Sequence, residues 1–174
     1  MAANMKAVKL RMKSIQSTMQ ITKAMELVAS SKLRKAKERA DASRPYFHTL
    51  ENTLEQIAAG NTDLSSVYTK KSKNEKWCYV VIAGDRGLAG GYNSNLFKEM
   101  ESQTAGKDYC VLPIGKKAVE YYKRRGIELV TEEFAEAGDI SVSDCFEIAA
   151  LLCRAFKTGE FGHAALGYTN FVSM

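Results

Sequence analysis

The first 44 residues of this chain contain no glycine, no proline and no aromatic residue. Nothing in this stretch interrupts a helix, and its apolar side chains recur every three and four positions, which is the helical period. A helix of this length would extend for about 66 Å at 1.5 Å per residue, well beyond the roughly three turns of a typical globular helix. The sequence therefore predicts that the chain begins as a rod.

The apolar positions of this rod follow a heptad repeat. With Met5 at position a, nine of the eleven a and d positions are apolar, and none of the eleven lysines and arginines in residues 1–44 occupies such a position. A seam of this kind requires a partner helix, because a lone helix cannot bury its own apolar stripe. The predicted seam residues are Met5, Val8, Met12, Ile15, Met19, Ala29, Leu33 and Ala36.

Residues 24–29 form an apolar band, interrupted only by Glu26, that runs almost all round the helix. A helix that is apolar on several faces is buried from several sides, so the band predicts a surrounding protein collar. The next turns are positively charged outside the seam, with Lys32, Arg34, Lys35, Lys37 and Arg39.

Charge is unevenly distributed along the chain. Residues 1–44 carry eleven basic and three acidic side chains, a balance of +8, whereas the remainder carries fourteen and seventeen, a balance of −3. A basic rod on a mildly acidic body suggests that the rod meets a negatively charged partner. The alternative is the solvated exterior of a coiled coil.

Pro45 marks a change in the rod, because the residue before a proline disfavours the helical conformation. The heptad phase nevertheless continues to Ile57, which leaves either a kinked helix or two helices meeting at residues 43–46, ending near Gly60. We expect a shaft helix over residues 1–59, a polar linker over 60–75 and an α/β domain over 76–174.

The α/β domain is predicted from strands that alternate with short helices. Expected strands cover residues 77–83, 109–114, 128–131 and 164–171, and expected helices cover 93–103, 116–125 and 143–157, the last capped by Ser143 or Asp144. Such alternation implies crossover connections and a mostly parallel sheet. The predicted fold class is α/β: a long N-terminal coiled-coil helix plus a small three-layer domain.

A glycine-rich loop, residues 84–91, follows the first strand, where phosphate-binding loops occur. Its spacing matches neither the dinucleotide pattern nor the phosphate loop of nucleotide hydrolases. Tyr92-Asn93 stands where Lys-Ser or Lys-Thr would hold phosphate and magnesium. We therefore interpret the loop as a tight turn whose glycines supply positive φ.

No catalytic constellation, metal site or cofactor site is predicted. His48 and His163 stand alone, and the four cysteines form no C-x-x-C pair but lie in apolar runs, as expected for buried, reduced thiols of a cytosolic protein. The apolar runs are too short to span a membrane.

Three separated segments of this sequence match one known protein family in their residues, order and spacing. ITKAMELVASSKLRK at 21–35, SRPY at 43–46 and DRGLAGGYNSNLFK at 85–98 together resemble the gamma subunit of the bacterial F-type ATP synthase, and the closing YTNF at 168–171 agrees. The likeness covers essentially the whole chain. Members of that family continue beyond the position of Met174 to a C-terminal helix, so the chain resembles a gamma subunit truncated before that helix.

The resemblance implies a central-stalk rotor subunit without an active site or cofactor. In this family the N-terminal helix pairs with the C-terminal helix inside a hexamer of alternating alpha and beta subunits. The α/β domain lies on the membrane ring of ion-carrying c subunits, beside the epsilon subunit, at the cytoplasmic face of the bacterial plasma membrane. Rotation couples ion flow to ATP synthesis or hydrolysis in the beta subunits. Residues expected to contact the alpha/beta collar are Lys23, Met25, Leu27, Val28, Lys32, Arg34, Lys35, Asp85 and Arg86.

Two other classes compete with the rotor. A basic helix followed by heptads is typical of leucine-zipper DNA-binding proteins, although here the basic residues overlap the seam, which uses Met, Ala and Thr rather than repeated Leu. A nucleotide-binding enzyme is the third class, and the spacing of the glycine loop argues against it.

Overall fold

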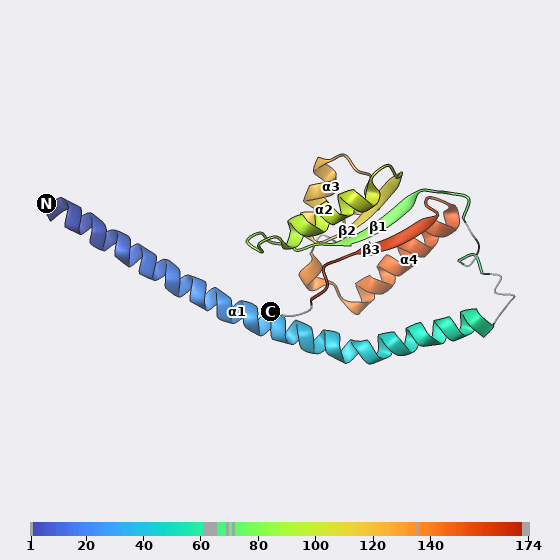
Figure 1. Ribbon diagram of the computed structural model, residues 1–174, viewed down its shortest axis with the longest axis horizontal. Coiled ribbons are helices and arrows are strands. Elements are labelled where there is room, and N and C mark those ends of the chain that lie inside the picture. The colour runs from blue at the N-terminus through green and yellow to red at the C-terminus, as the bar shows by residue number, and fades with distance from the viewer. Residues whose placement is uncertain (1, 61–65, 69, 71, 135, 172–174) are drawn as a thin grey trace. The chain divides into compact units, whose positions relative to one another are not determined.

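The computed structural model describes residues 2–60, 66–68, 70, 72–134 and 136–171, and the chain divides into two compact units, Met1–Leu64 and Ser65–Met174. The first unit contains the helix α1 (Ala2–Gly60), and the second contains the α/β domain (Figure 1). Part of the linker predicted over residues 60–75 lies outside the described residues.

Helix α1 is a single helix of 59 residues that continues through Pro45. The sequence left open a kinked helix or two helices, and the structure has one curved, uninterrupted ribbon (Figure 1). Proline lacks the amide proton for one helical hydrogen bond, and its ring crowds the carbonyl four residues earlier, so a helix bends there. Around the bend, the Ser43 hydroxyl donates to the Ala40 carbonyl at 2.9 Å, and the Thr49 hydroxyl donates to the Pro45 carbonyl at 2.8 Å.

The sheet of the α/β domain has the strand order β2-β1-β3, with every pairing parallel. Its strands are β1 (Trp77–Ile82), β2 (Tyr109–Ile114) and β3 (His163–Gly167). The sequence of β1, WCYVVI, is apolar at successive positions because helices cover both of its faces. The predicted fold class, a long helix plus an α/β domain with a parallel sheet, is confirmed.

Helices on both faces of the sheet give the domain three layers (Figure 1). On one face, α2 (Tyr92–Thr104) and α3 (Lys116–Arg124) pack through Leu96, Phe97, Met100, Ala118 and Tyr122 onto Tyr79, Val81 and Val111. On the other face, α4 (Val142–Thr158) packs through Ile148 and Ala155 onto Cys78, Val80, Cys110 and Leu112, with Phe134 and Phe161 in the same core.

The N-terminus of α4 corrects one detail of the sequence interpretation. Ser141, rather than Ser143 or Asp144, is the cap residue, and Asp144 completes a capping box with it. The Asp144 amide donates to the Ser141 hydroxyl at 3.2 Å, and the Ser141 amide donates to the Asp144 carboxylate at 2.7 Å. Each residue thus satisfies a donor that the first helical turn leaves open.

Two predicted strands are wrong in extent. Residues 128–131 do not form a strand, because they touch the sheet only through an isolated parallel bridge between Val111 and Leu129. The strand predicted over 164–171 is β3, which runs from His163 to Gly167 and makes its last pairing with Val81 of β1.

Two of the four cysteines also differ from expectation. Cys78 and Cys110 are buried, whereas Cys145 and Cys153 are exposed, and all four are free thiols. Within α4 the buried residues are Ile148 and Ala155, and Cys145 borders an apolar hollow between this helix and β3.

Strand β3 forms an edge of the sheet in the described part of the chain. Between β3 and α4 the surface is hollowed, with a volume of about 390 Å³. Side chains lining this hollow include Val80, Ile82, Ile114, Ile148, Leu152 and Leu166.

Candidate functional site

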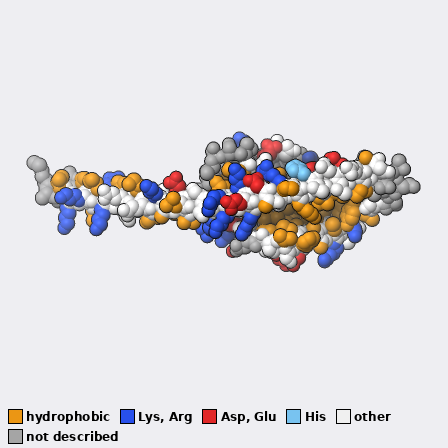
Figure 2. Space-filling model, turned by 90° about the horizontal axis from the view of Figure 1, so that it is seen from below, with side chains coloured by type: hydrophobic (Ala, Val, Ile, Leu, Met, Phe, Trp, Pro, Cys, Tyr) orange, Lys and Arg blue, Asp and Glu red, His pale blue; other side chains and the backbone are white. Residues whose placement is uncertain are grey.

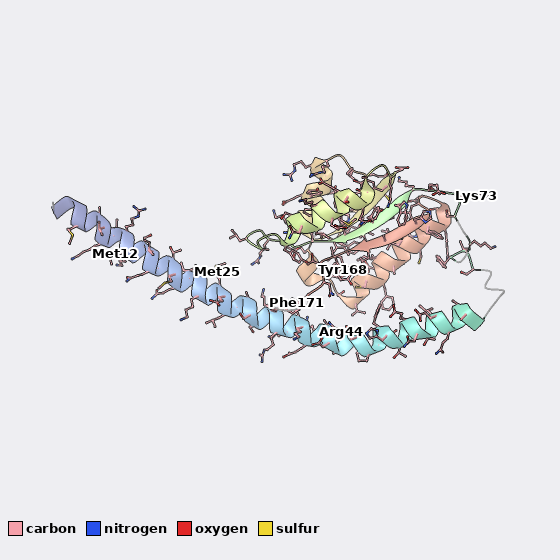
Figure 3. All side chains as sticks on the ribbon, in the orientation of Figure 1. Met12, Met25, Arg44, Lys73, Tyr168 and Phe171 are labelled. Carbon is pink, nitrogen blue, oxygen red and sulfur yellow. The ribbon has the colours of Figure 1, made fainter. Side chains whose placement is uncertain are left out.

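The predicted seam residues of α1 are largely exposed in the described structure. Met5, Val8, Met12, Ile15 and Met19 have exposed fractions between 48% and 65%, Ala29 and Ala36 are also exposed, and Leu33 is half-buried. Met12 is labelled in Figure 3 among the side chains that project from the helix. Covering this row of apolar side chains would be strongly favourable, since fully burying one large apolar side chain contributes about 1.5–3 kcal/mol. This surface is suited to bind another helix.

The apolar band at residues 24–29 points in several directions. Because an α-helix turns by about 100° per residue, Met25 and Val28 lie on one side of α1, whereas Leu27 lies nearly opposite Met25. Their exposed fractions are 61%, 67% and 57%. A single partner helix covers only one side, so this segment is suited to an enclosing surface.

The basic residues on either side of the band are largely free to bind a partner. The Arg34 guanidinium lies 3.9 Å from the Glu38 carboxylate, and both side chains are mostly exposed. Lys23, Lys32 and Lys35 form no ion pair with any residue that the structure describes. Figure 2 shows basic and hydrophobic side chains interspersed on the helix surface.

The other two predicted collar residues, Asp85 and Arg86, lie in the loop between β1 and α2, and therefore in the second unit of the chain. The Asp85 carboxylate is engaged within the domain. Its Oδ1 accepts hydrogen bonds from the backbone amides of Ala137 at 2.8 Å and Lys116 at 3.2 Å. Its Oδ2 accepts from the Gly138 amide at 2.9 Å. One side chain thereby joins three segments that are distant in sequence.

These contacts perturb the acidity of Asp85. Partial burial of the carboxyl group works to raise its pKa, but the amides of Ala137, Gly138 and Lys116, helped by the charge of Arg86, outweigh burial and hold the pKa below its usual value. The hydrogen bonds favour the ionised form because a carboxylate accepts while a protonated acid must donate one proton. Asp85 is thus a fixed anion at neutral pH.

Beyond Asp85, the loop protrudes into solvent. Arg86 is exposed, and Leu88 is fully exposed with a φ of 60°. The sequence predicted that the glycines would supply positive φ. Gly90 does so, with a φ of 55°, but the other positive φ in this loop belongs to Leu88. No sequence signal marks a leucine for that conformation.

A second cluster between α2 and α3 was not predicted from the sequence. The Tyr121 ring stacks on Phe97 with ring centres 3.9 Å apart. The Arg125 guanidinium also contacts the Tyr121 ring and lies 3.8 Å from its centre. Glu101 accepts from the Tyr121 hydroxyl and pairs with Arg125. Burial and the hydrogen bond to Glu101 raise the pKa of Tyr121 to about 12. These contacts tie α2 to α3 and leave each charged group with a partner.

The described residues provide neither a cluster of metal ligands nor a membrane-spanning helix. No group of three or more histidine, cysteine, aspartate or glutamate side chains in that part of the chain is arranged to hold a metal ion. Among the helices that the structure describes, none combines the length and apolarity needed to cross a bilayer.

Comparison with known proteins places this architecture in one family. A family model described as ATP synthase matches residues 4–174. The ATP synthase gamma chain of Ruminococcus albus is 45% identical over 177 aligned residues, which cover 99% of this chain and 62% of that protein. The sodium-ion-specific ATP synthase gamma chain of Acetobacterium woodii is 36% identical, and the alignment covers 99% of this chain and 58% of that protein. The ATP synthase gamma chain of Heliobacterium modesticaldum is 35% identical, and the alignment covers 97% of this chain and 59% of that protein. The chain therefore spans about three fifths of the length of these relatives.

Proposed function

This chain belongs to the ATP synthase gamma-chain family, and we propose from that premise that it is the central-stalk rotor subunit of an F-type ATP synthase. In this role it couples ion-driven rotation of the membrane ring to ATP synthesis or hydrolysis in the beta subunits. The subunit contributes no catalytic residue of its own. It works at the cytoplasmic face of the bacterial plasma membrane as a peripheral component.

The observation that carries the proposal is the surface of α1. A helix of 59 residues exposes an apolar seam, an apolar band on several sides and basic residues, of which Lys23, Lys32 and Lys35 have no ion pair with any described residue. The seam suits the C-terminal helix of a full-length gamma chain, and the band suits an enclosing ring of alpha and beta subunits. A helix with both features can be enclosed by the collar and can still rotate within it.

The basic residues suit a contact that must form and break during rotation. Exposed ion pairs contribute only about 0.2–1 kcal/mol each, so the acidic surface of the collar would hold Lys23, Lys32, Arg34 and Lys35 weakly. Several weak pairs guide a moving surface without locking it. Loss of one of these residues alone should therefore have little effect.

The α/β domain is assigned to the foot of the stalk, with the membrane c-ring and the epsilon subunit as its partners. Asp85 and Arg86 are proposed to belong to its contact with the alpha/beta collar. The support for this assignment is the protruding loop, in which Arg86 is exposed next to a fixed Asp85.

The test compares two triple variants of Lys32, Arg34 and Lys35 in the reconstituted complex. Changing all three to Glu places negative charges against an acidic collar, and should lower complex yield or the ratio of ATP-driven ion pumping to ATP hydrolysis. Changing all three to Gln removes attraction without adding repulsion and should give a much smaller loss. ATP binding in the beta subunits should remain intact in both. Wild-type yield and pumping ratio in the Glu variant would show that these residues are only a solvated helix face.

A further inference from the structure

Cys78 and Cys110 are two free, buried thiols that face each other across neighbouring strands. They are direct partners in the parallel pairing of β1 with β2, and both lie in the core between the sheet and α4. Parallel strands lie about 4.8 Å apart, which is within the Cα separations of about 4.4–6.8 Å that a disulfide can bridge. By contrast, Cys145 and Cys153 are separated by about 12 Å along the axis of α4.

The two sulfur atoms interact with each other and differ in acidity. The Cys78 thiol and the Cys110 sulfur share a hydrogen bond, and the Cys110 thiol also donates to the Trp77 carbonyl at 3.7 Å. The bond with Cys78, helped by the positive charge of Lys76, lowers the pKa of the Cys110 thiol against the effect of burial. The same bond and burial raise the pKa of Cys78. Cys110 therefore ionises first, and the thiolate is the nucleophilic form.

This pair lies next to the point at which the chain enters β1. The Lys76 carbonyl accepts from the amides of Gly162 and His163 at 2.9 and 3.3 Å. The Trp77 amide donates to the Asp108 carbonyl at 3.0 Å. The start of β1 is thus held between the segments that lead into β2 and β3. The β-carbons of a disulfide lie about 3.8 Å apart, so a bridge would draw β1 toward β2 and away from β3.

We propose that Cys78 and Cys110 form a reversible disulfide on exposure to a peroxide, and that this bridge loosens the contact of β1 with the start of β3. The Cys110 thiolate attacks one peroxide oxygen, the O–O bond breaks, and a sulfenic acid forms; the released hydroxide combines with the proton that Cys110 gave up and leaves as water. The Cys78 sulfur then attacks the Cys110 sulfur, so that an S–S bond forms and the S–O bond breaks. The hydroxide released in this step takes the Cys78 proton and leaves as a second water. The two thiols are oxidised by two electrons, and the peroxide is reduced by two.

The bridge is expected to be easily reduced. Facing side chains on parallel strands must be drawn together to form it, and strained disulfides are the labile ones. Two glutathione thiols would restore both cysteines by exchange and become one glutathione disulfide. Transient disulfides of this kind are the ones that occur in reducing compartments. The inference does not rest on the proposed function, because it requires only the α/β domain.

The first experiment oxidises the Cys145→Ser, Cys153→Ser variant of the chain with hydrogen peroxide. Both substituted thiols are exposed, so the fold should be unchanged and the buried pair should be the remaining thiols. After free thiols are blocked, trypsin should release a peptide that joins residues 77–86 to 108–116 and is lost on treatment with reduced glutathione. If the two peptides are joined only when the chain is oxidised in urea, the folded sheet does not permit the bridge and the proposal is wrong.

The order of the two steps is tested by adding Cys78→Ala to the same variant. Cys110 should then stop at the sulfenic acid, which dimedone traps, whereas the matching Cys110→Ala variant should give much less trapped product because the pKa of Cys78 is raised. Urea unfolding of both variants checks that they are folded. Equal trapping at the two positions would contradict the assignment of Cys110 as the first nucleophile.

Hydrogen exchange of the fully bridged chain tests the effect on β3. The amides of Gly162 and His163 should exchange about tenfold faster than in the reduced chain, because their acceptor, the Lys76 carbonyl, moves with β1. The Gly126 amide, which donates to the Lys123 carbonyl at 3.1 Å at the end of α3, is the control and should change by less than about threefold. Unchanged exchange at Gly162 and His163 would show that the bridge forms without loosening this contact, and would overturn that part of the proposal.

Discussion

Asp85 is predicted to be a major source of stability in the α/β domain, because it joins the β1–α2 loop to the starts of α3 and of the short helix at Ala137–Asp139. Asp85→Ala leaves three amide donors without their acceptor. The Ala137 hydrogen bond is partly buried, and its loss should cost about 2 kcal/mol as a bond to a charged group. The other two are exposed, so water can replace the carboxylate at about 0.5 kcal/mol each. The expected total is about 3 kcal/mol.

Asp85→Asn should be milder, with a loss of about 2 kcal/mol. The Asn carbonyl can replace Oδ1, which serves Lys116 and Ala137, but its amide group would face the Gly138 amide, and two donors cannot pair. For a domain of this size, 1 kcal/mol lowers the midpoint of thermal unfolding by roughly 4 °C. The two variants should therefore unfold about 12 °C and about 8 °C below wild type.

The assay is unfolding of the chain by heat, for the midpoint, and by urea, for the free energy, each followed by the fluorescence of its single tryptophan, Trp77. Trp77 begins β1 and stacks on Tyr79 and His163, with ring centres 5.7 and 4.8 Å apart, so its emission reports the integrity of the sheet. Glu147→Gln controls for the loss of a carboxylate charge. If Asp85→Ala unfolds within about 0.5 kcal/mol of wild type, a value normal for surface substitutions, the hydrogen bonds to Asp85 do not stabilise the domain.

Three further predictions use the same unfolding assay. The pKa of Asp85 is lowered in the folded protein, so its contribution to the free energy of unfolding is complete above the unfolded pKa of about 3.9 and is lost as pH falls through the folded pKa. The difference in free energy of unfolding between wild type and Asp85→Asn should therefore narrow below about pH 4. A constant difference down to about pH 2 would contradict this prediction. Gly115→Ala should destabilise the fold by about 3 kcal/mol or more, because Gly115 has a φ of 94° and an added β-carbon would lie 2.1 Å from the Ala83 carbonyl oxygen. Gly126→Ala is the control: its φ is 67° but no atom lies near the added β-carbon, so it should cost about 1 kcal/mol. Equal losses in the two variants would contradict the steric argument. Ser141→Ala should cost about 1 kcal/mol through loss of the α4 cap, and an unchanged midpoint would mean that water replaces the hydroxyl.

Elements governed by local periodicity could be predicted from the sequence. The absence of helix breakers and the spacing of apolar residues indicated α1, and runs of β-branched residues indicated β1 and β2 within one residue of their ends. The predicted helix at 143–157 was close to α4, but its cap was assigned two or three residues late because Ser143 and Asp144 are equally good capping types.

Features that depend on distant residues could not be predicted in this way. The three amides bound by Asp85 lie 31–53 positions further along the chain, and sequence spacing carries no information on their approach. Residues 128–131 have the composition of a strand, but only Leu129 is bridged to the sheet. The positive φ of Leu88 follows from the contacts that hold both ends of its loop, so neither the leucine nor its neighbours reveal it.

The outer edge of β3 has a consequence for handling the protein. The strand sequence, HAALG, carries no lysine, glutamate or proline, which are the residues that commonly guard strand edges. Leu166 is 57% exposed beside the apolar hollow next to α4. Within the described residues, this edge offers backbone donors and acceptors with no strand beyond them. An unguarded edge is a template on which a second molecule can add a strand. Aggregation of the 174-residue chain should therefore begin at β3, and its solubility should depend more on this short strand than on the highly charged α1.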